Sequence, residues 1–186
     1  MANVYDAIDE RLAAFLTAQK VFFVGTAPSG VDGPVNISPK GLDSFRVLGP
    51  TEVAYLDLHG SGAETIAHLR DNGRIVVMAC AFDGPPRIVR LHGRGEAVLR
   101  DDPRFADLLA AFPTADLPPP RAVVRVDVTR ISDSCGWGVP TVGTMEERDI
   151  MHRVAAAQDE ADFAAAREHN RTSIDGLPAL EVDAEG

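Results

Sequence analysis

The chain of 186 residues is poor in cysteine and lysine and contains no long apolar run. Two cysteines, Cys80 and Cys135, cannot form a disulfide framework, so we expect a reduced, cytoplasmic setting. No stretch approaches the roughly 20 apolar residues that a membrane-spanning helix needs. The first residues are acidic and lack a basic flank before an apolar centre, which predicts no signal peptide.

Basic surface is also lacking. The net charge is −10, and residues 145–186 hold four arginines against eleven acidic residues. No basic stripe exists for a phosphate backbone or an anionic membrane, so we expect neither nucleic acid nor membrane as a partner. The length suits one core. We predict a domain over 1–144 and an acidic helical extension over 145–186 that packs on that domain or on a second subunit.

Several signatures of enzyme classes are absent. The five histidines show no H-E-x-x-H spacing, and no cysteine pair accompanies them, so a metal site is not expected. The chain has no G-x-S-x-G, no Walker A motif and no G-x-G-x-x-G. Hydrolase, nucleotide triphosphatase and Rossmann functions therefore lose their usual support.

What the chain does contain is a series of short apolar strands with few helices. Apolar periodicity predicts helices over 4–19, 61–72 and 101–112, and two short helices near the end. Ser61 and Glu64 have the spacing of a capping box for the second helix. Alternating or unbroken apolar runs predict strands over 21–24, 35–38, 45–48, 53–58, 74–82, 87–99 and 122–131. This order indicates a mainly β, α+β fold with flanking helices, built on a closed or partly closed antiparallel barrel.

Three strand ends carry small, hydroxylic or cationic residues. They are Val35–Gly41, Tyr55–Thr65 and Arg87–Gly95. Together they would form a phosphate site beside an apolar wall, as a nucleotide-like cofactor needs. Lys40 offers a mobile charge next to the Ser38 hydroxyl, and the helix beginning near Ser61 would favour an anion.

Each of these features also has an ordinary structural interpretation. Lys40 could be a solvated turn residue, and Ser61 a simple helix cap. Arg87 could be a surface arginine. Trp137, between two glycines, could face a flat cofactor ring or pack in the core. The neighbouring Cys135 is expected to be inert, because no histidine lies near it in sequence.

The combined motifs resemble the pyridoxamine 5'-phosphate oxidase-like family. They are Asn36-x-Ser-Pro-Lys-Gly41, Tyr55-x-Asp57, Ser61-Gly-x-Glu-Thr65 and Pro86-Arg-x-x-Arg-Leu-x-Gly-x-Gly95. A bacterial branch of that family continues with Ser-Cys-Gly-aromatic-Gly-Val-Pro and ends near Ser-Ile-Asp-Gly-Leu-Pro, which are present here at 134–140 and 173–178.

The resemblance implies a split-barrel homodimer that binds FMN between its subunits. The ring would lie along Asn36, Ile37 and Ser38, and the phosphate near Lys40. The expected cofactor-binding residues are Asn36, Ile37, Ser38, Lys40, Tyr55, Asp57, Ser61, Gly62, Thr65, Arg87 and Trp137. Catalytic residues are not predicted.

The chain also departs from the true oxidases of the family. Where they have a basic pair in the phosphate turn, this chain has Gly62-Ala63-Glu64, and their C-terminal Arg-x-His element is not recognisable. We therefore expect an FMN-dependent oxidoreductase acting on a small-molecule substrate other than pyridoxamine phosphate. The alternatives are deazaflavin F420 or haem as cofactor, or a non-catalytic barrel that carries such a ligand or has lost it.

Overall fold

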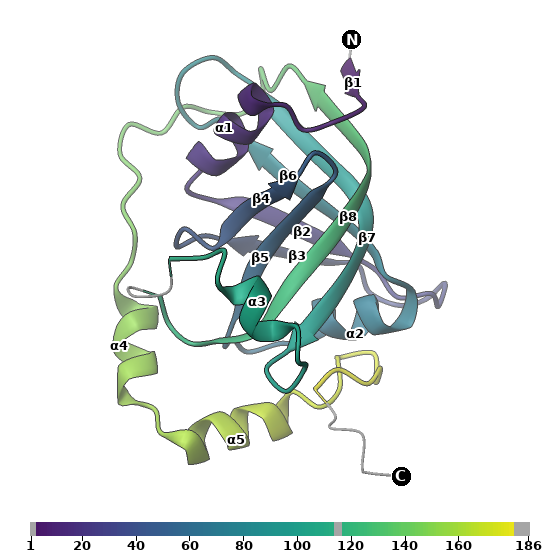
Figure 1. Ribbon diagram of the computed structural model, residues 1–186, viewed down its shortest axis with the longest axis vertical. Helices are drawn as coiled ribbons and strands as arrows, with labels where there is room; N and C mark the ends of the chain where they lie inside the picture. Colours follow the sequence, from purple (N-terminus) through teal and green to yellow (C-terminus); the bar gives the residue numbers. More distant parts are fainter. Residues whose placement is uncertain (1–2, 114–116, 181–186) are drawn as a thin grey trace.

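The computed structural model describes residues 3–113 and 117–180. Its sheet is antiparallel and has eight strands, in the order β3-β2-β6-β7-β8-β5-β4, with β1 beside β8 (Figure 1). The strands are β1 (Asn3–Tyr5), β2 (Phe22–Thr26), β3 (Asn36–Lys40), β4 (Phe45–Gly49), β5 (Glu52–Leu58), β6 (Arg74–Cys80), β7 (Ile88–Leu99) and β8 (Pro120–Ser134). The helices are α1 (Glu10–Ala18), α2 (Glu64–Asn72), α3 (Phe105–Leu109), α4 (Ile150–Ala157) and α5 (Glu160–His169).

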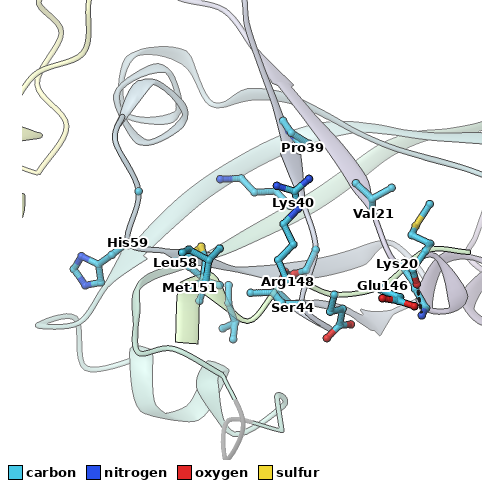
Figure 2. Close-up of a pocket in the computed structure, with 17 residues that line it drawn as sticks. Lys20, Val21, Pro39, Lys40, Ser44, Leu58, His59, Glu146, Arg148 and Met151 are labelled. Atoms are coloured by element: carbon cyan, nitrogen blue, oxygen red, sulfur yellow. Dashed lines mark hydrogen bonds between the residues drawn. The ribbon is translucent and has the colours of Figure 1, made fainter. Parts of the chain in front are cut away.

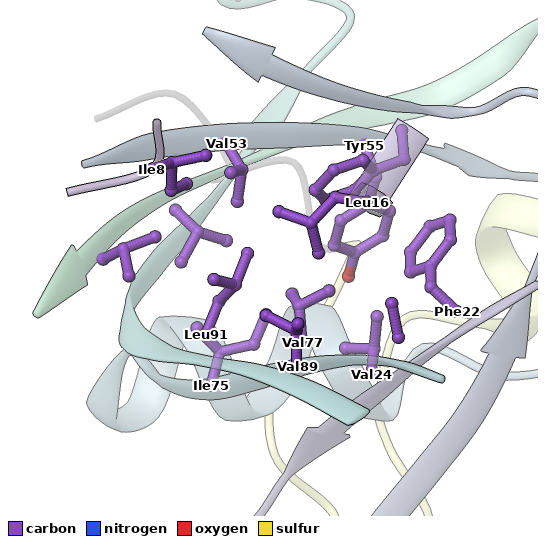
Figure 3. Packing of buried hydrophobic residues seen from close by; sticks show 14 of the residues in the cluster. Ile8, Leu16, Phe22, Val24, Val53, Tyr55, Ile75, Val77, Val89 and Leu91 are labelled. Atoms are coloured by element: carbon purple, nitrogen blue, oxygen red, sulfur yellow. The ribbon is translucent and has the colours of Figure 1, made fainter. Parts of the chain in front are cut away.

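The sheet coils around one main hydrophobic core. Its two end regions meet there, because the ring of Phe22 on β2 lies 5.3 Å from that of Phe45 on β4 and 5.6 Å from that of Tyr55 on β5 (Figure 3). The end strands β3 and β4 are not hydrogen-bonded to each other in this sheet. The result is an antiparallel split barrel with flanking helices, which confirms the predicted fold class.

The long strands β7 and β8 form the spine of the barrel. Their ladder shifts register between His92 and Gly93, where the strand bends around the core. A side chain at Gly93 would place its Cβ only 2.2 Å from the backbone oxygen of Asp127, so the close approach of the two strands requires glycine.

The first predicted helix is wrong in its N-terminal half. Residues Asn3–Tyr5 form β1, which pairs with β8, and the helix begins only at Glu10. The Asp9 carboxylate caps it by accepting a hydrogen bond from the Leu12 amide at 2.7 Å. The apolar periodicity therefore predicts α1 correctly, whereas the start of the predicted helix is a strand.

Two further helix predictions need correction. Helix α2 begins at Glu64 with Ala63 as its cap and no side-chain capping bond, so the predicted capping box of Ser61 and Glu64 is absent. Helix α3 covers only Phe105–Leu109 of the predicted 101–112. The strand predicted to stop before Pro39 continues through it, because β3 is an edge strand that can accommodate a proline.

The C-terminal extension contains the two short helices that were predicted, α4 and α5, and runs along the lower end of the barrel (Figure 1). Its contacts with the barrel include a hydrogen bond from Lys20 to the Met145 carbonyl at 2.8 Å. Ala179 and Leu180 are buried against α2, whereas the acidic Glu181–Gly186 lies outside the described residues. Among the described residues, no helix is both long and apolar enough to span a membrane.

Candidate functional site

The centre of the candidate site is a buried charge network on β3, β5 and β8. Asp57 is 1% exposed, and its two oxygens contact different cations. Lys40 Nζ lies 3.3 Å from Oδ1, and Arg121 Nε lies 2.6 Å from Oδ2. A buried carboxylate is stable as an ion only with such partners. Asp57 therefore fixes the position of Lys40, and the three groups together carry one net positive charge.

Arg121 also ties the turn before α2 to this network. Its second terminal nitrogen donates to the Gly62 carbonyl at 2.6 Å. Gly62 and Lys40 thus belong to one cluster, which joins two of the three strand ends singled out in the sequence. Arg121 itself was not predicted. Its only sequence signal is an arginine between a proline run and a strongly apolar strand, and its partner lies 64 residues away.

Asn36, Ser38 and Lys40 lie on one face of β3, since side chains alternate along a strand. The Asn36 amide donates to the hydroxyls of Thr26 at 3.1 Å and Thr65 at 3.0 Å. The Ser38 hydroxyl donates to the Asn36 side-chain oxygen at 3.3 Å. Ile37 points to the opposite face and is 69% exposed. The structure therefore brings together Asn36, Ser38 and Thr65, and joins them through β3 to Lys40.

A cavity of about 470 Å³ opens beside Lys40 (Figure 2). The ends of β3 and β5 form one side of it, and residues 145–151 of the extension form the other. Its apolar wall consists of Val21, Pro39, Leu42, Leu56, Leu58, Met145, Ile150 and Met151. The cavity begins at Pro39, so Asn36 and Ser38 lie beside it on the same strand and do not line it.

Arg148 brings a second cation to this cavity from the extension (Figure 2). Among the described residues it has no ion-pair partner. Lys20 also lines the cavity, as do Glu146 and Glu147, so the lining combines three cations with two acids. Arg148 was missed because the acidic composition of residues 145–186 gives no indication that one of its arginines faces the barrel.

His59 lies at the edge of the same cavity. Burial lowers the pKa of its imidazole, and the positive charge of Arg121 lowers it further. The centre of its ring lies 4.7 Å from that of Phe163 on α5, with the two ring planes tilted by 42°. Burial and the charge of Arg121 both favour the neutral form of His59, whereas an anion bound in the cavity would favour the protonated form.

Two of the predicted residues are not accessible. Tyr55 is fully buried between Phe22 and the other core residues, so a flavin ring cannot contact it without opening the core (Figure 3). Burial, followed by the charge of Asp57, raises the pKa of its phenol well above the usual value. Asp57 is the second inaccessible residue, and its effect on a ligand would pass through its partners Lys40 and Arg121. The position of Tyr55 corrects its interpretation as a ring neighbour.

Arg87 lies in a separate cluster. Its guanidinium contacts Asp133 at 2.9 Å, and a cavity beside it includes Cys135. Burial opposes ionisation of Asp133, but hydrogen bonds from Tyr5, Arg87 and Asn3 outweigh it and lower the pKa. Trp137 is 83% exposed. Among the residues that the structure describes, no hydrogen bond or ion pair joins Arg87 or Trp137 to the Lys40 cluster.

The remaining predicted residue, Ser61, is exposed at the turn before α2 and makes no capping bond. The described residues contain no group of three or more histidine, cysteine or acidic side chains that could hold a metal ion. The site is thus a cationic and apolar cavity with a polar edge along β3.

Comparison with known proteins identifies the family. Residues 8–135 match the family model of pyridoxamine 5'-phosphate oxidase. The chain belongs to this family. The pyridoxamine 5'-phosphate oxidase family protein ustO of Aspergillus flavus is 38% identical over 196 residues, which cover 97% of this chain and 78% of the relative.

Solved structures of similar fold include HupZ of Group A Streptococcus. It matches with a TM-score of 0.55 and 22% identity, over 73% of this chain and 99% of HupZ. The H111A variant of HupZ matches with a TM-score of 0.56 and 22% identity, over 68% of this chain and 99% of that chain. At 22% identity, the likeness to HupZ shows only that the two proteins share a fold.

Proposed function

We propose that the protein binds FMN in the cavity beside Lys40 and acts as a flavin-dependent oxidoreductase on a small molecule. The observation that carries the proposal is that Lys40 and Arg148 both line one largely apolar cavity (Figure 2). An anion and a flat apolar ring are the two parts of FMN, and this lining offers a partner for each. Membership of the pyridoxamine 5'-phosphate oxidase family supports the same cofactor.

The residues present fit FMN in size and in chemistry. A volume of about 470 Å³ lies within the range of roughly 300–1,000 Å³ that is usual for cofactor sites. Lys40 and Arg148 can hold the phosphate as a point charge and as a fork of donors, respectively. The Leu58 and Pro39 side chains provide an apolar surface for the ring.

Bound FMN would supply the redox chemistry, and the protein would supply binding and orientation. Lys40 is held by Asp57 from behind, so its ammonium group stays at the cavity instead of moving freely in solvent. The Met145–Met151 segment forms one side of the cavity and would limit access of water to a bound ring. The basic pair missing from Gly62–Glu64 is replaced in this proposal by Arg121 behind the turn and Arg148 opposite it.

A homodimer completes the proposal. The edge strand β3 exposes Ile37 by 69% and its neighbour Val35 by 72%, and Trp137 is 83% exposed. Isolated exposed apolar residues are common, but here one lies on the edge strand beside the candidate site and the other directly precedes that strand. Burial of this edge by a second copy would remove its unpaired backbone groups from solvent and could bring Trp137 of one subunit towards the cavity of the other.

The visible absorption spectrum of the purified protein tests the proposal. We expect a two-band flavin spectrum after reconstitution with FMN and removal of excess ligand, at one flavin per chain. Reduction of this flavin by a nicotinamide donor would establish the oxidoreductase function. A protein that retains no flavin, but retains F420 or haem under the same treatment, would contradict the cofactor assignment.

A further inference from the structure

The Ser-Ile-Asp-Gly-Leu-Pro motif at residues 173–178 lies far from the cavity in sequence, yet it contacts the fully buried His68 on α2. His68 is 0% exposed, and its Nε2 lies 3.5 Å from Asp175 Oδ2. Its Nδ1 lies 3.0 Å from the Thr26 hydroxyl. The groups that face the two ring nitrogens of a buried imidazole determine which nitrogen carries the proton.

The partners of His68 fix that arrangement. The Ser173 hydroxyl donates to Asp175 Oδ1, so Oδ2 is the oxygen that faces His68. This hydrogen bond, which is the main cause, lowers the pKa of Asp175, and an ionised carboxylate only accepts hydrogen bonds. A carboxylate that faces Nε2 favours a proton on that nitrogen. Nε2 forms no hydrogen bond of normal geometry with any described residue, so its contact with Asp175 at 3.5 Å is electrostatic.

The other end of the imidazole follows from the threonine. Thr26 Oγ1 accepts a hydrogen bond from the Asn36 amide and lies 3.0 Å from His68 Nδ1, so for a neutral imidazole with its proton on Nε2 the Thr26 hydroxyl donates to Nδ1. Nδ1 is therefore the acceptor. The Asn36 NH₂ group donates to the threonine hydroxyls, so only the side-chain oxygen of Asn36 is left to accept a hydrogen bond. The Ser38 hydroxyl donates to that oxygen. The donors all point in one direction along the series, from Ser38 through Asn36, Thr26 and His68 to Asp175.

We propose that His68 and Asp175 are positioning residues for the candidate flavin site, because the contact of Asp175 with His68 sets the direction of the hydrogen-bond series from His68 to Ser38 and, with it, the donor and acceptor pattern of β3. The proton of Ser38 is committed to Asn36, so Ser38 Oγ, which lies beside the cavity on β3, offers only lone pairs to a ligand that extends from the cavity along the strand. A ligand N–H can then bond to Ser38, whereas a ligand carbonyl cannot. This inference rests on the proposed function for the identity of the ligand, but the order of protons exists in the protein alone.

Asp175→Asn is expected to reverse the series. The amide oxygen would accept from Ser173, and the NH₂ group would then face His68 Nε2. The imidazole proton would move to Nδ1 and donate to Thr26. The Asn36 side-chain amide would turn over so that its oxygen accepts from Thr26, and the Ser38 proton would become free because Ser38 would then accept from the Asn36 NH₂ group. Ile174→Ala is the matched control, since Ile174 is 78% exposed in the same motif.

The first measurement is the proton position on His68 in the protein without ligand, from ¹⁵N shifts of the imidazole assigned with His68→Gln. We expect the proton on Nε2 in the wild type and in Ile174→Ala, and on Nδ1 in freshly prepared Asp175→Asn whose mass confirms the intact asparagine. A wild-type proton on Nδ1 would overturn the proposal, whatever the protein binds.

The second measurement is the affinity for FMN. Replacing an acceptor by a donor at Ser38 is expected to weaken FMN by about fivefold in Asp175→Asn, the effect of one neutral hydrogen bond, with no change in Ile174→Ala. Unchanged affinity and an unchanged flavin spectrum in Asp175→Asn, with the proton shifted, would overturn the positioning role alone. A wild type that binds no FMN would instead overturn the proposed function and the positioning role, while the ¹⁵N result would still decide the order of protons.

Discussion

Arg121→Met is the perturbation that examines the buried network most sharply. Arg121 is 7% exposed and Asp57 is 1% exposed, so the substitution leaves a carboxylate in the interior without its closest partner. Breaking a buried ion pair in this way costs about 3–5 kcal/mol. Lys40 remains 3.3 Å from the carboxylate and compensates in part, whereas the Gly62 carbonyl loses its donor at a cost of about 1 kcal/mol. We expect a loss of about 3 kcal/mol in the free energy of unfolding.

Urea unfolding followed by circular dichroism measures this loss, and a double-mutant cycle assigns it to the pair. Asp57→Asn alone should also destabilise, because it leaves the Arg121 charge buried. The double variant Asp57→Asn with Arg121→Met should be more stable than the sum of the two single effects predicts, by at least about 1 kcal/mol. A loss below about 1 kcal/mol for Arg121→Met, or strictly additive single effects, would refute the account of the network.

Three further predictions concern the cavity, the Asp133 cluster and the dimer. Arg148→Ala should weaken FMN about fivefold, as expected for a partly exposed charge pair, whereas Arg153→Ala on α4 should not; equal effects would remove Arg148 from the site. Asp133→Asn should destabilise the protein at pH 7, and the deficit should shrink in acid. Since the folded-state pKa of Asp133 is lowered, its stabilisation is complete above the unfolded value of about 3.9 and is lost as the pH falls through the folded value. A deficit equal at pH 7 and pH 3 in unfolding experiments would contradict this. Ile37→Lys should shift the protein towards monomer in analytical ultracentrifugation, and an unchanged sedimentation profile would exclude β3 from the interface.

The strands were predictable because their signal is local. Apolar runs such as Arg74–Cys80 are buried in the middle of the sheet, and that pattern is visible without knowledge of the neighbours. Helix ends were less predictable, since they depend on which side chain reaches the free amides. Asp9 caps α1 in the structure, whereas Ser61 does not cap α2 although its spacing is correct.

The candidate site was predictable in part. Lys40, Asn36 and Thr65 could be singled out because each lies at a strand or helix end with chemistry of its own. Arg121 could not, because its function comes from Asp57, a partner 64 residues away. Sequence spacing carries no information on such a pair.

The structure also shows the contacts of a motif whose role could not be explained from the sequence. The motif at residues 173–178 could be recognised by family resemblance, but the residues that it contacts could not be predicted. Asp175 faces His68 on α2, and Ser173 holds Asp175 in place. Arg148 illustrates the same difficulty, since the composition of its segment is acidic and its position beside the cavity depends on how the extension folds back.

The central claim is that the cavity beside Lys40 holds a flavin through its phosphate, and the most direct test compares FMN with riboflavin. The two ligands share the ring and differ in the phosphate, so the ratio of their dissociation constants isolates the phosphate contacts. A charge-assisted hydrogen bond contributes about 1.5–3 kcal/mol, so calorimetric titration should show FMN binding at least about tenfold tighter than riboflavin. Lys40→Ala should remove most of that difference and leave riboflavin unaffected. Equal affinity of the wild type for both ligands, or an unchanged preference in Lys40→Ala, would contradict the account.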